Sequence, residues 1–182
     1  MKLPVFLKKS RNFFRQFDVY QLLAIPVALL VLFHSIDLRS ASLQIGVVLP
    51  LSGEHSHRAN THLNGLLLAA RHINEMGGIS GRKLSLQIRD SQGLPITTAE
   101  VTRDLIYESS VTALIGGFSP ANTRIMQALS EQAQVPFITS ICTHFDITDS
   151  GNNFTFRSIT DDRRQFEALA EYAARRFASR KP

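Results

Sequence analysis

Short apolar runs alternate along this chain with longer stretches in which apolar residues recur every three or four positions. The first run, Leu43–Leu49, contains three β-branched residues and ends at Pro50, a pattern typical of a strand buried on both faces of a parallel sheet. A helical pattern over 64–73 stops at the glycine pair 77–78, and a second strand is expected from Leu84. This order predicts a βαβ unit with an open loop at its first corner.

The same alternation continues downstream. The expected elements, in chain order, are a helix over 97–109, a strand over 111–115, a helix over 120–134, strands over 135–138 and 154–157, and a final helix capped by Asp161. Thr97 or Thr98 is expected near the cap of the first of these helices. Its apolar side is expected to comprise Val101, Leu105, Ile106 and Tyr107. Repeated units of this length predict an α/β fold, a doubly wound and mostly parallel sheet with helices on both faces.

In open parallel sheets, ligands bind beyond the carboxyl ends of the strands, where the strand order reverses. The loops that meet this condition cover 51–59, 116–122 and 139–145. Ser119 offers a hydroxyl at a helix start, where the free amides of 121–123 carry the positive end of the helix dipole, an arrangement suited to a carboxylate. The alternative is that Ser119 serves only as a helix cap.

Six short motifs occur in one order along the chain: PLSG at 50–53, NG at 64–65, INEMGGISGRKL at 73–84 followed by Asp90, ALIGGFSPANT at 113–123, VPFITSICT at 135–143 and FTFRSITDD at 154–162. In these motifs the chain resembles the periplasmic leucine-binding family of ABC-transporter receptors, the type I periplasmic binding proteins. The resemblance runs from Leu43 to Phe177. It implies the first lobe of an extracytoplasmic substrate-binding protein, part of an ABC-type uptake system for amino acids or related small carboxylated or amide metabolites. Neither catalysis nor a cofactor is implied.

The resemblance also implies roles for single residues. The family holds the carboxylate of an amino acid through a serine and main-chain amides, roles that fall here on Ser119 or Ala121. It contacts the ammonium through a threonine after the fourth strand and a nearby carbonyl, which correspond to Thr143 and the carbonyl of Cys142. Pro120 replaces the second hydroxyl residue of many relatives, which leaves amino-acid specificity open. The predicted ligand-binding residues are Ser52, Arg58, Ser119, Ala121, Asn122, Cys142 and Thr143.

The first corner departs from the family, whose members usually carry a glycine or an aromatic residue there. This chain has His55, His57 and Arg58 instead. Arg58 is expected either to meet an anionic ligand or to be an ordinary surface charge. The histidines, with His62, lack a local carboxylate or cysteine to complete a metal site, so solvated side chains are the favoured interpretation. Asp90 is expected to close a loop and not to act in catalysis.

Charge is unevenly distributed along the sequence. The 182 residues include 20 Lys and Arg against 15 Asp and Glu, a formal net charge of +5. Residues 1–17 hold five of the basic side chains and no acid, so the remainder is balanced at 15 against 15. Nothing in that remainder resembles a phosphate-binding face, and we therefore expect no nucleic-acid partner.

The basic arm, residues 1–18, precedes an apolar segment over 19–36. As a helix, the 18 uncharged residues between Asp18 and Asp37 would be about 27 Å long, a marginal span for a hydrocarbon core of about 30 Å. The positive flank predicts that the rest of the chain lies on the periplasmic side of a bacterial inner membrane. Two fates are open, a signal peptide cleaved near 40–42 or an uncleaved anchor, which the long basic arm favours. A linker over 37–42 then leads to a lobe over 43–182.

Three other interpretations compete with transport. A dinucleotide-binding enzyme needs GxGxxG after the first strand, where this chain has PLSGEHSHRAN, and the single Cys142 has only His144 as a local basic partner. A membrane-anchored sensor would pass ligand-driven closure to a signalling partner in place of a permease, and an uncleaved segment 19–36 would favour it. Because family members close two lobes around a ligand, a truncated fragment that binds weakly or not at all is the third alternative.

Overall fold

The computed structural model describes residues 41–149 and 151–177. The expected basic arm (1–18), the apolar segment (19–36) and all but the last two residues of the linker (37–42) lie outside the described residues. Within the described part of the chain, no helix combines the length and the apolar character that crossing a bilayer requires.

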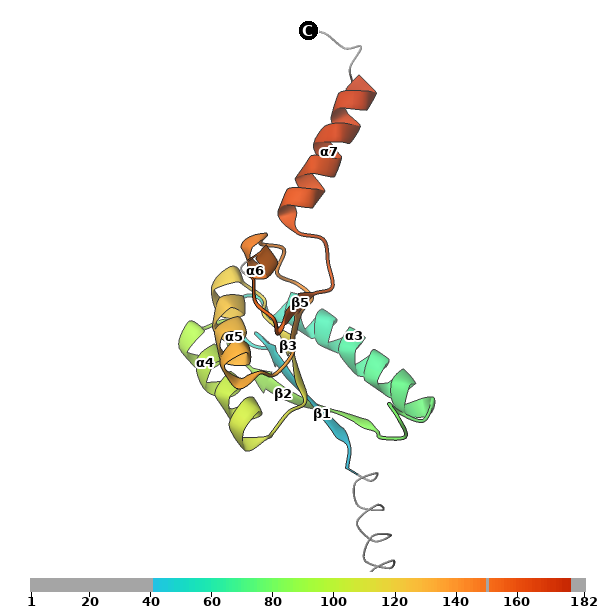
Figure 1. Ribbon diagram of the computed structural model, residues 1–182, viewed down its shortest axis with the longest axis vertical. Coiled ribbons are helices and arrows are strands. Elements are labelled where there is room, and N and C mark those ends of the chain that lie inside the picture. Colours follow the sequence, from blue (N-terminus) through green and yellow to red (C-terminus); the bar gives the residue numbers. More distant parts are fainter. Residues whose placement is uncertain (1–40, 150, 178–182) are drawn as a thin grey trace, which may run out of the picture. The chain divides into compact units, whose positions relative to one another are not determined.

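Within the described residues, five strands form a single parallel sheet (Figure 1). They are β1 (Leu43–Leu49), β2 (Leu84–Asp90), β3 (Ala113–Gly116), β4 (Phe137–Thr139) and β5 (Thr155–Arg157), in the order β2-β1-β3-β4-β5. All four neighbouring pairs are parallel. The chain passes from β1 outward to β2 and then returns across β1 to β3, so the strand order reverses between β1 and β3. The predicted parallel α/β sheet is confirmed.

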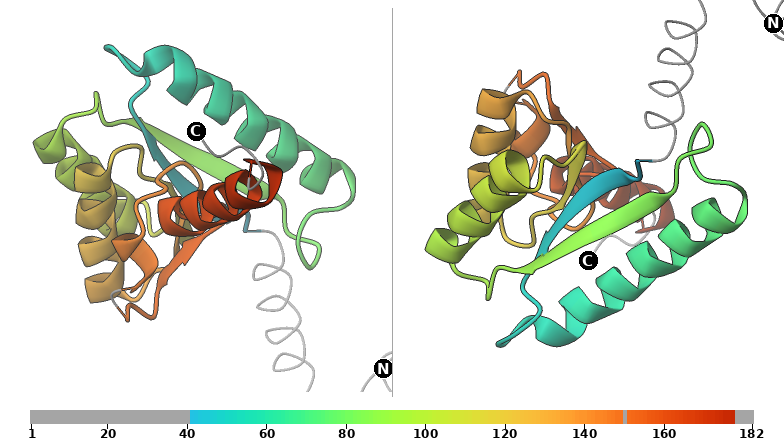
Figure 2. Two further views of the ribbon diagram at one scale, coloured as in Figure 1. Left: turned by 90° about the horizontal axis from the view of Figure 1, so that it is seen from above. Right: turned by 90° about the horizontal axis from the view of Figure 1, so that it is seen from below.

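Helices cover both faces of this sheet (Figure 2). The helices of the described residues are, in chain order, α3 (Ser56–Glu75), α4 (Pro95–Arg103), the π-helical turn η2 (Asp104–Glu108), α5 (Pro120–Ala133), α6 (Asp146–Asp149) and α7 (Asp162–Phe177). Figure 2 shows α3 on one side of the sheet and α4 and α5 on the other. This arrangement is the predicted doubly wound fold.

The core of the described part of the chain consists of two hydrophobic clusters, and β1 contributes residues to both. Val48 packs beneath α4, η2 and α5 with Leu105, Leu114, Met126 and Phe137. Val47 and Leu49 point to the opposite face and pack with Ala59 of α3. Successive strand residues face opposite sides of a sheet, so an uninterrupted apolar run is what a strand buried on both faces requires.

The helix α3 begins eight residues earlier than the apolar pattern predicted, at Ser56. Its first two turns are mostly polar, and only Ala59 and Ala70 are buried along the whole helix. The expected loop over 51–59 is therefore shorter, and Arg58 lies in the first turn of a helix. The prediction failed because Ala59 is the one buried residue in this end of the helix, so the sequence there carries no apolar periodicity.

Two details of the segment 97–109 also differ from expectation. The helix α4 begins at Pro95 after Leu94, so neither Thr97 nor Thr98 caps it. Thr98 is buried, and its hydroxyl donates to the Leu94 carbonyl at 2.8 Å. Leu105 and Ile106 are buried as expected, but Tyr107, expected on the same side, is 55% exposed because the helix widens into η2. Strand β4 likewise begins two residues later than predicted.

The last helix forms where helical spacing predicted it, but it buries no residue. Its large apolar side chains are between 49% and 66% exposed: Phe166, Leu169, Tyr172 and Phe177. Figure 1 shows α7 apart from the helices that cover the sheet.

Candidate functional site

The turn after β3 depends on two glycines. Gly116 has φ +153°, and a Cβ there would lie 2.2 Å from the Val48 carbonyl oxygen of β1. Gly117 has φ +77°, and a Cβ there would lie 2.6 Å from the Thr123 hydroxyl at the start of α5. Both positions exclude a side chain, because the backbone approaches β1 and α5 too closely. The turn thereby presents Phe118 at the carboxyl end of the sheet.

Helix α5 begins immediately after this turn. Ser119 is its N-cap, and its hydroxyl accepts the Asn122 amide at 3.3 Å. The Thr123 amide donates to the Ser119 carbonyl at 2.9 Å. Of the three amides expected to be free for an anion, two are therefore already bonded, which corrects that expectation. The Ala121 amide is the one without a hydrogen bond inside the described part of the chain.

The Asn122 side chain points from the start of α5 toward the loop after β2. It is buried and donates to the Gly93 carbonyl at 3.1 Å, so it holds the loop after β2. Its amide oxygen has no hydrogen-bond partner within the described residues. Asn122 was predicted to contact ligand, and the structure places it instead behind the helix start.

The first corner is closed by Asp90 at the end of β2. Its carboxylate accepts the Leu51 amide at 2.8 Å, the Gln92 amide at 2.8 Å and the Ser52 amide at 3.4 Å. Partial burial raises the pKa of Asp90, but these amides and the Ser52 hydroxyl together lower it below its usual value. Asp90 therefore acts as the expected loop-closing residue, and Ser52 is held by it on the exposed side of the corner.

Asp90→Asn tests this role through pH. Because the folded-state pKa is lowered, the charged carboxylate stabilises the fold above the usual value of 3.8, and this contribution is lost as the pH falls through the lowered value. We expect the urea midpoint of the variant to lie below that of the parent near neutral pH, and the gap to close at acidic pH. A gap that stays constant with pH would show that the charge of Asp90 is irrelevant.

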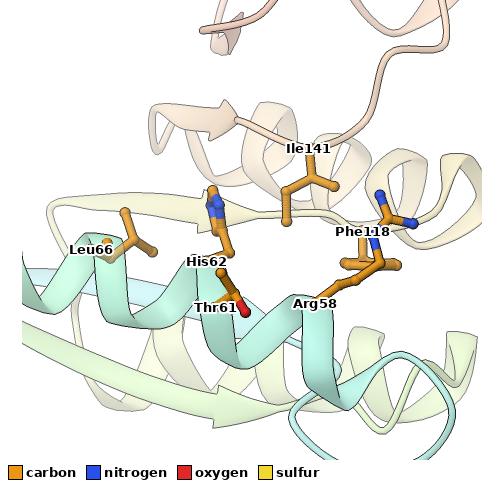
Figure 3. Close-up of a pocket in the computed structure, with 7 residues that line it drawn as sticks. Arg58, Thr61, His62, Leu66, Phe118 and Ile141 are labelled. Atoms are coloured by element: carbon orange, nitrogen blue, oxygen red, sulfur yellow. The ribbon is translucent and has the colours of Figure 1, made fainter.

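Two adjoining pockets lie at the carboxyl ends of β1, β3 and β4, and Figure 3 shows the first of them. The first, of 410 Å³, is lined by Arg58, Thr61, His62, Gly65, Leu66, Phe118 and Ile141. The second, of 210 Å³, is lined by Arg58, Phe118, Pro120, Ile141, Cys142, Thr143, His144 and Asp162. They share Arg58, Phe118 and Ile141 as a common wall. The structure thus brings the three predicted corner loops together.

The predicted site residues divide into three groups. Arg58, Cys142 and Thr143 line the second pocket, although the Cys142 side chain is itself buried. Ser119 and Ala121 stand at the helix start beside it, next to Pro120. Ser52 and Asn122 line neither pocket.

Several lining residues were missed by the sequence analysis: Thr61, His62, Leu66, Phe118, Ile141 and Asp162. Thr61 and His62 could not be placed on a helix that was expected to begin at residue 64, whereas Leu66 lay within that helix but was not assigned to the site. Phe118 could have been recognised from the sequence. It is a large aromatic residue between a glycine pair and a helix cap, without apolar neighbours in sequence, and such a residue is a candidate for a pocket wall. For Asp162, the sequence contains no indication of a role in the site other than its position directly after the helix cap Asp161.

The common wall is built around the Phe118 ring. The Arg58 guanidinium lies 5.3 Å from the ring centroid, within the range of a cation–π contact, and the His55 ring stacks on Phe118 at 5.0 Å. His62 Nε2 lies 2.7 Å from the Ser140 hydroxyl, which links α3 to the loop after β4. Burial lowers the pKa of His62, so its imidazole is uncharged near neutral pH.

Histidines at this corner do not gather into a metal centre. In the part of the chain that the structure describes, no three His, Cys, Asp or Glu side chains are grouped so that they could hold a metal ion. His55 and His62 are instead engaged with Phe118 and Ser140, respectively.

The loop after β4 is fixed by Arg157 of β5. Its guanidinium donates to the carbonyls of Thr143 and His144 at 3.4 and 2.8 Å and to the Thr148 hydroxyl at 2.6 Å. It also pairs with Asp161 at 3.3 Å, and the Arg157 side chain is only 6% exposed. One buried cation therefore joins β5, the pocket loop, α6 and the start of α7.

Asp161 completes this connection as the predicted cap of α7. Its carboxylate accepts the Arg164 amide at 2.9 Å. That hydrogen bond, together with the charge of Arg157, lowers the pKa of Asp161. The next amide, that of Asp162, donates to the Thr143 carbonyl at 2.9 Å, so Asp162 is held at the second pocket.

The chain is similar in sequence to known proteins. A profile of the family described as periplasmic binding protein matches residues 42–181. The amino acid binding protein of Pseudomonas aeruginosa is 27% identical over 132 residues, covering 72% of this chain and 35% of the relative. The Leu/Ile/Val-binding protein homolog 8 of Brucella abortus is 30% identical over 118 residues, covering 65% and 29%, respectively. The chain spans about a third of the length of these curated relatives.

Solved structures give the same result. The branched-chain amino acid transporter substrate-binding protein LivJ from Streptococcus pneumoniae, in complex with isoleucine, matches with a TM-score of 0.67 and 26% identity, covering 73% of this chain and 38% of that one. An ABC transporter substrate-binding protein from Desulfitobacterium hafniense, in complex with Leu, matches with a TM-score of 0.66 and 28% identity, covering 74% and 39%.

Proposed function

Because this chain belongs to the periplasmic binding protein family, we propose that it provides one wall of a binding site for amino acids or related small carboxylated or amide metabolites. The protein then serves an ABC-type uptake system on the extracytoplasmic side, delivers its ligand to a membrane permease and carries out no catalysis. The observation that carries the proposal is the convergence of three strand-end loops on the two adjoining pockets. The segment 19–36 would hold the chain at the membrane or direct its export.

The polar groups at the second pocket suit a zwitterion. The free Ala121 amide at the start of α5 and the Ser119 hydroxyl offer donors to a carboxylate. On the other side, Asp162 supplies a negative charge, and the Thr143 hydroxyl supplies an acceptor for an ammonium. The Thr143 carbonyl does not contribute, because it already accepts from Asp162 and Arg157.

Saturation-transfer NMR of the whole chain with L-leucine tests this proposal. One wall of a cleft is expected to bind in the millimolar range, about −4 kcal/mol. We expect leucine to give a saturable signal, and 4-methylpentanoate and 3-methylbutylamine, which each lack one charged group, to bind at least several-fold more weakly. Ser119→Ala and Thr143→Val should weaken leucine binding.

A matched control is Thr112→Val, since Thr112 is exposed at the amino end of β3, away from both pockets. It should leave leucine binding unchanged. Equal signals from leucine and both truncated compounds, or no saturable signal from any of them, would contradict a zwitterion site.

A further inference from the structure

The first pocket extends the site along α3, beyond the groups that a simple zwitterion needs. Figure 3 shows Arg58, Thr61, His62 and Leu66 carried by α3, with Phe118 and Ile141 opposite them. Gly65 lies in the same wall, and a Cβ on it would meet nothing within 4 Å. This pocket has about twice the volume of the second, 410 against 210 Å³, so there is room for a ligand side chain.

Arg58 brings an uncompensated charge to this pocket. Within the described residues its guanidinium makes no ion pair with an acidic side chain, and its contact is the face of the Phe118 ring at 5.3 Å. The other arginine of α3, Arg71, is paired with Glu75 at 3.6 Å. A guanidinium held against an aromatic face keeps its donor edge available for a planar anion.

The remaining lining of the first pocket is neutral. It contains no acidic residue, and the burial that lowers the pKa of His62 keeps that imidazole uncharged near neutral pH. Leu66, Phe118 and Ile141 give the pocket an apolar floor, on which a short hydrocarbon stem can lie. One cation above an apolar floor recognises a carboxylate carried on methylene groups.

We propose that the first pocket is a subsite for a second anionic group, so that the preferred ligand is an amino acid whose side chain ends in a carboxylate. The proposal rests on the proposed function, because the backbone groups of that ligand occupy the second pocket. Its side-chain stem lies over Phe118 and Ile141, and its terminal carboxylate meets Arg58.

The experiment compares L-glutamate with L-glutamine, which have the same shape and differ in side-chain charge. Saturation-transfer NMR titrations of the whole chain should give glutamate a dissociation constant about tenfold below that of glutamine, which corresponds to about 1.4 kcal/mol. In Arg58→Gln this ratio should fall to about one, because the charge-assisted contact is removed. Arg71→Gln is the matched control, since it removes an equal charge from α3 outside both pockets and should retain the ratio.

A second pair of variants tests whether the ligand side chain occupies the space of the first pocket, without changing any charge. Gly65→Leu should fill the first pocket and weaken glutamate binding about fivefold or more, and Gly65→Ala, which adds only one methyl group, should weaken it by much less. Both variants are expected to fold, because a Cβ at position 65 would meet nothing within 4 Å and both alanine and leucine favour a helix over glycine. This pair keeps the test valid even if the Arg58 variant changes the surface elsewhere.

The outcomes separate the two proposals. Glutamate binding no tighter than glutamine, or a ratio that survives Arg58→Gln, would overturn the anionic subsite while leucine binding still supports the zwitterion site. Failure of every amino acid to bind would overturn both. A preference for glutamate that Arg71→Gln abolishes as fully as Arg58→Gln would assign the effect to net charge and also overturn the subsite.

Discussion

Gly116→Ala is expected to destabilise the fold severely, by about 3 kcal/mol or more and a melting temperature lower by about 10 °C or more. Its Cβ would lie 2.2 Å from the Val48 carbonyl oxygen and 3.3 Å from Met126, and the residue would have to adopt φ +153°. The carbonyl belongs to the backbone of β1, which pairs with β3 at this point, so the neighbour cannot yield without opening the centre of the sheet. The measurement is thermal unfolding followed by circular dichroism.

Gly65→Ala is the matched control for that substitution. The same methyl group enters open space in the middle of α3, where alanine is favoured over glycine by about 0.5–1 kcal/mol. We expect its melting temperature to equal or exceed that of the parent. A Gly116→Ala variant as stable as the parent would show that β1 and β3 are not in close contact where the strand order reverses.

Arg157→Met is expected to have the second largest effect, lowering the melting temperature by roughly 5 °C or more. The substitution keeps an apolar stem but removes four polar contacts at once and leaves the Asp161 carboxylate without its buried cation. The loop that carries Thr143 and the start of α7 should lose their common anchor. Hydrogen exchange should therefore accelerate at the Asp162 and Arg164 amides, which donate within this connection.

Arg175→Met provides the comparison. Arg175 pairs with Glu171 at 3.1 Å, but its side chain is 82% exposed, so this pair should contribute little. Its melting temperature and its exchange at the pocket loop should match those of the parent. Equal effects from the two arginine variants would mean that Arg157 does not fix the pocket loop.

The fold could be predicted from sequence where burial leaves a periodic pattern. The run around Val47, Val48 and Leu49 is apolar at every position because both faces of β1 are covered. The helix α5 shows a buried stripe and a Ser-Pro start, and the glycine pair 116–117 marks the tight turn between it and β3. These features are local, so the succession of strands and helices along the chain followed from them, whereas the order of the strands within the sheet did not.

The candidate site was only partly predictable because it lies where burial is low. The start of α3 has almost no apolar residue to indicate a helix, and so Thr61 and His62 were not placed beside Phe118. The amides of Asn122 and Thr123 were expected to be free, but Ser119 uses both as it caps the helix. The anchoring by Arg157 joins residues from separate elements, and no sequence pattern marks such contacts.

A nitrogen-15 NMR titration of the whole chain with L-leucine tests the central claim most directly, because it reports where on the chain a ligand binds. We expect the largest amide shifts to occur together in the three corners, over 51–58, 118–122 and 141–144. Amides at the amino ends of the strands, such as those of Thr112 and Gln134, should stay unchanged. Shifts confined to the amino ends, or spread evenly over the chain, would contradict a ligand site built from these corners.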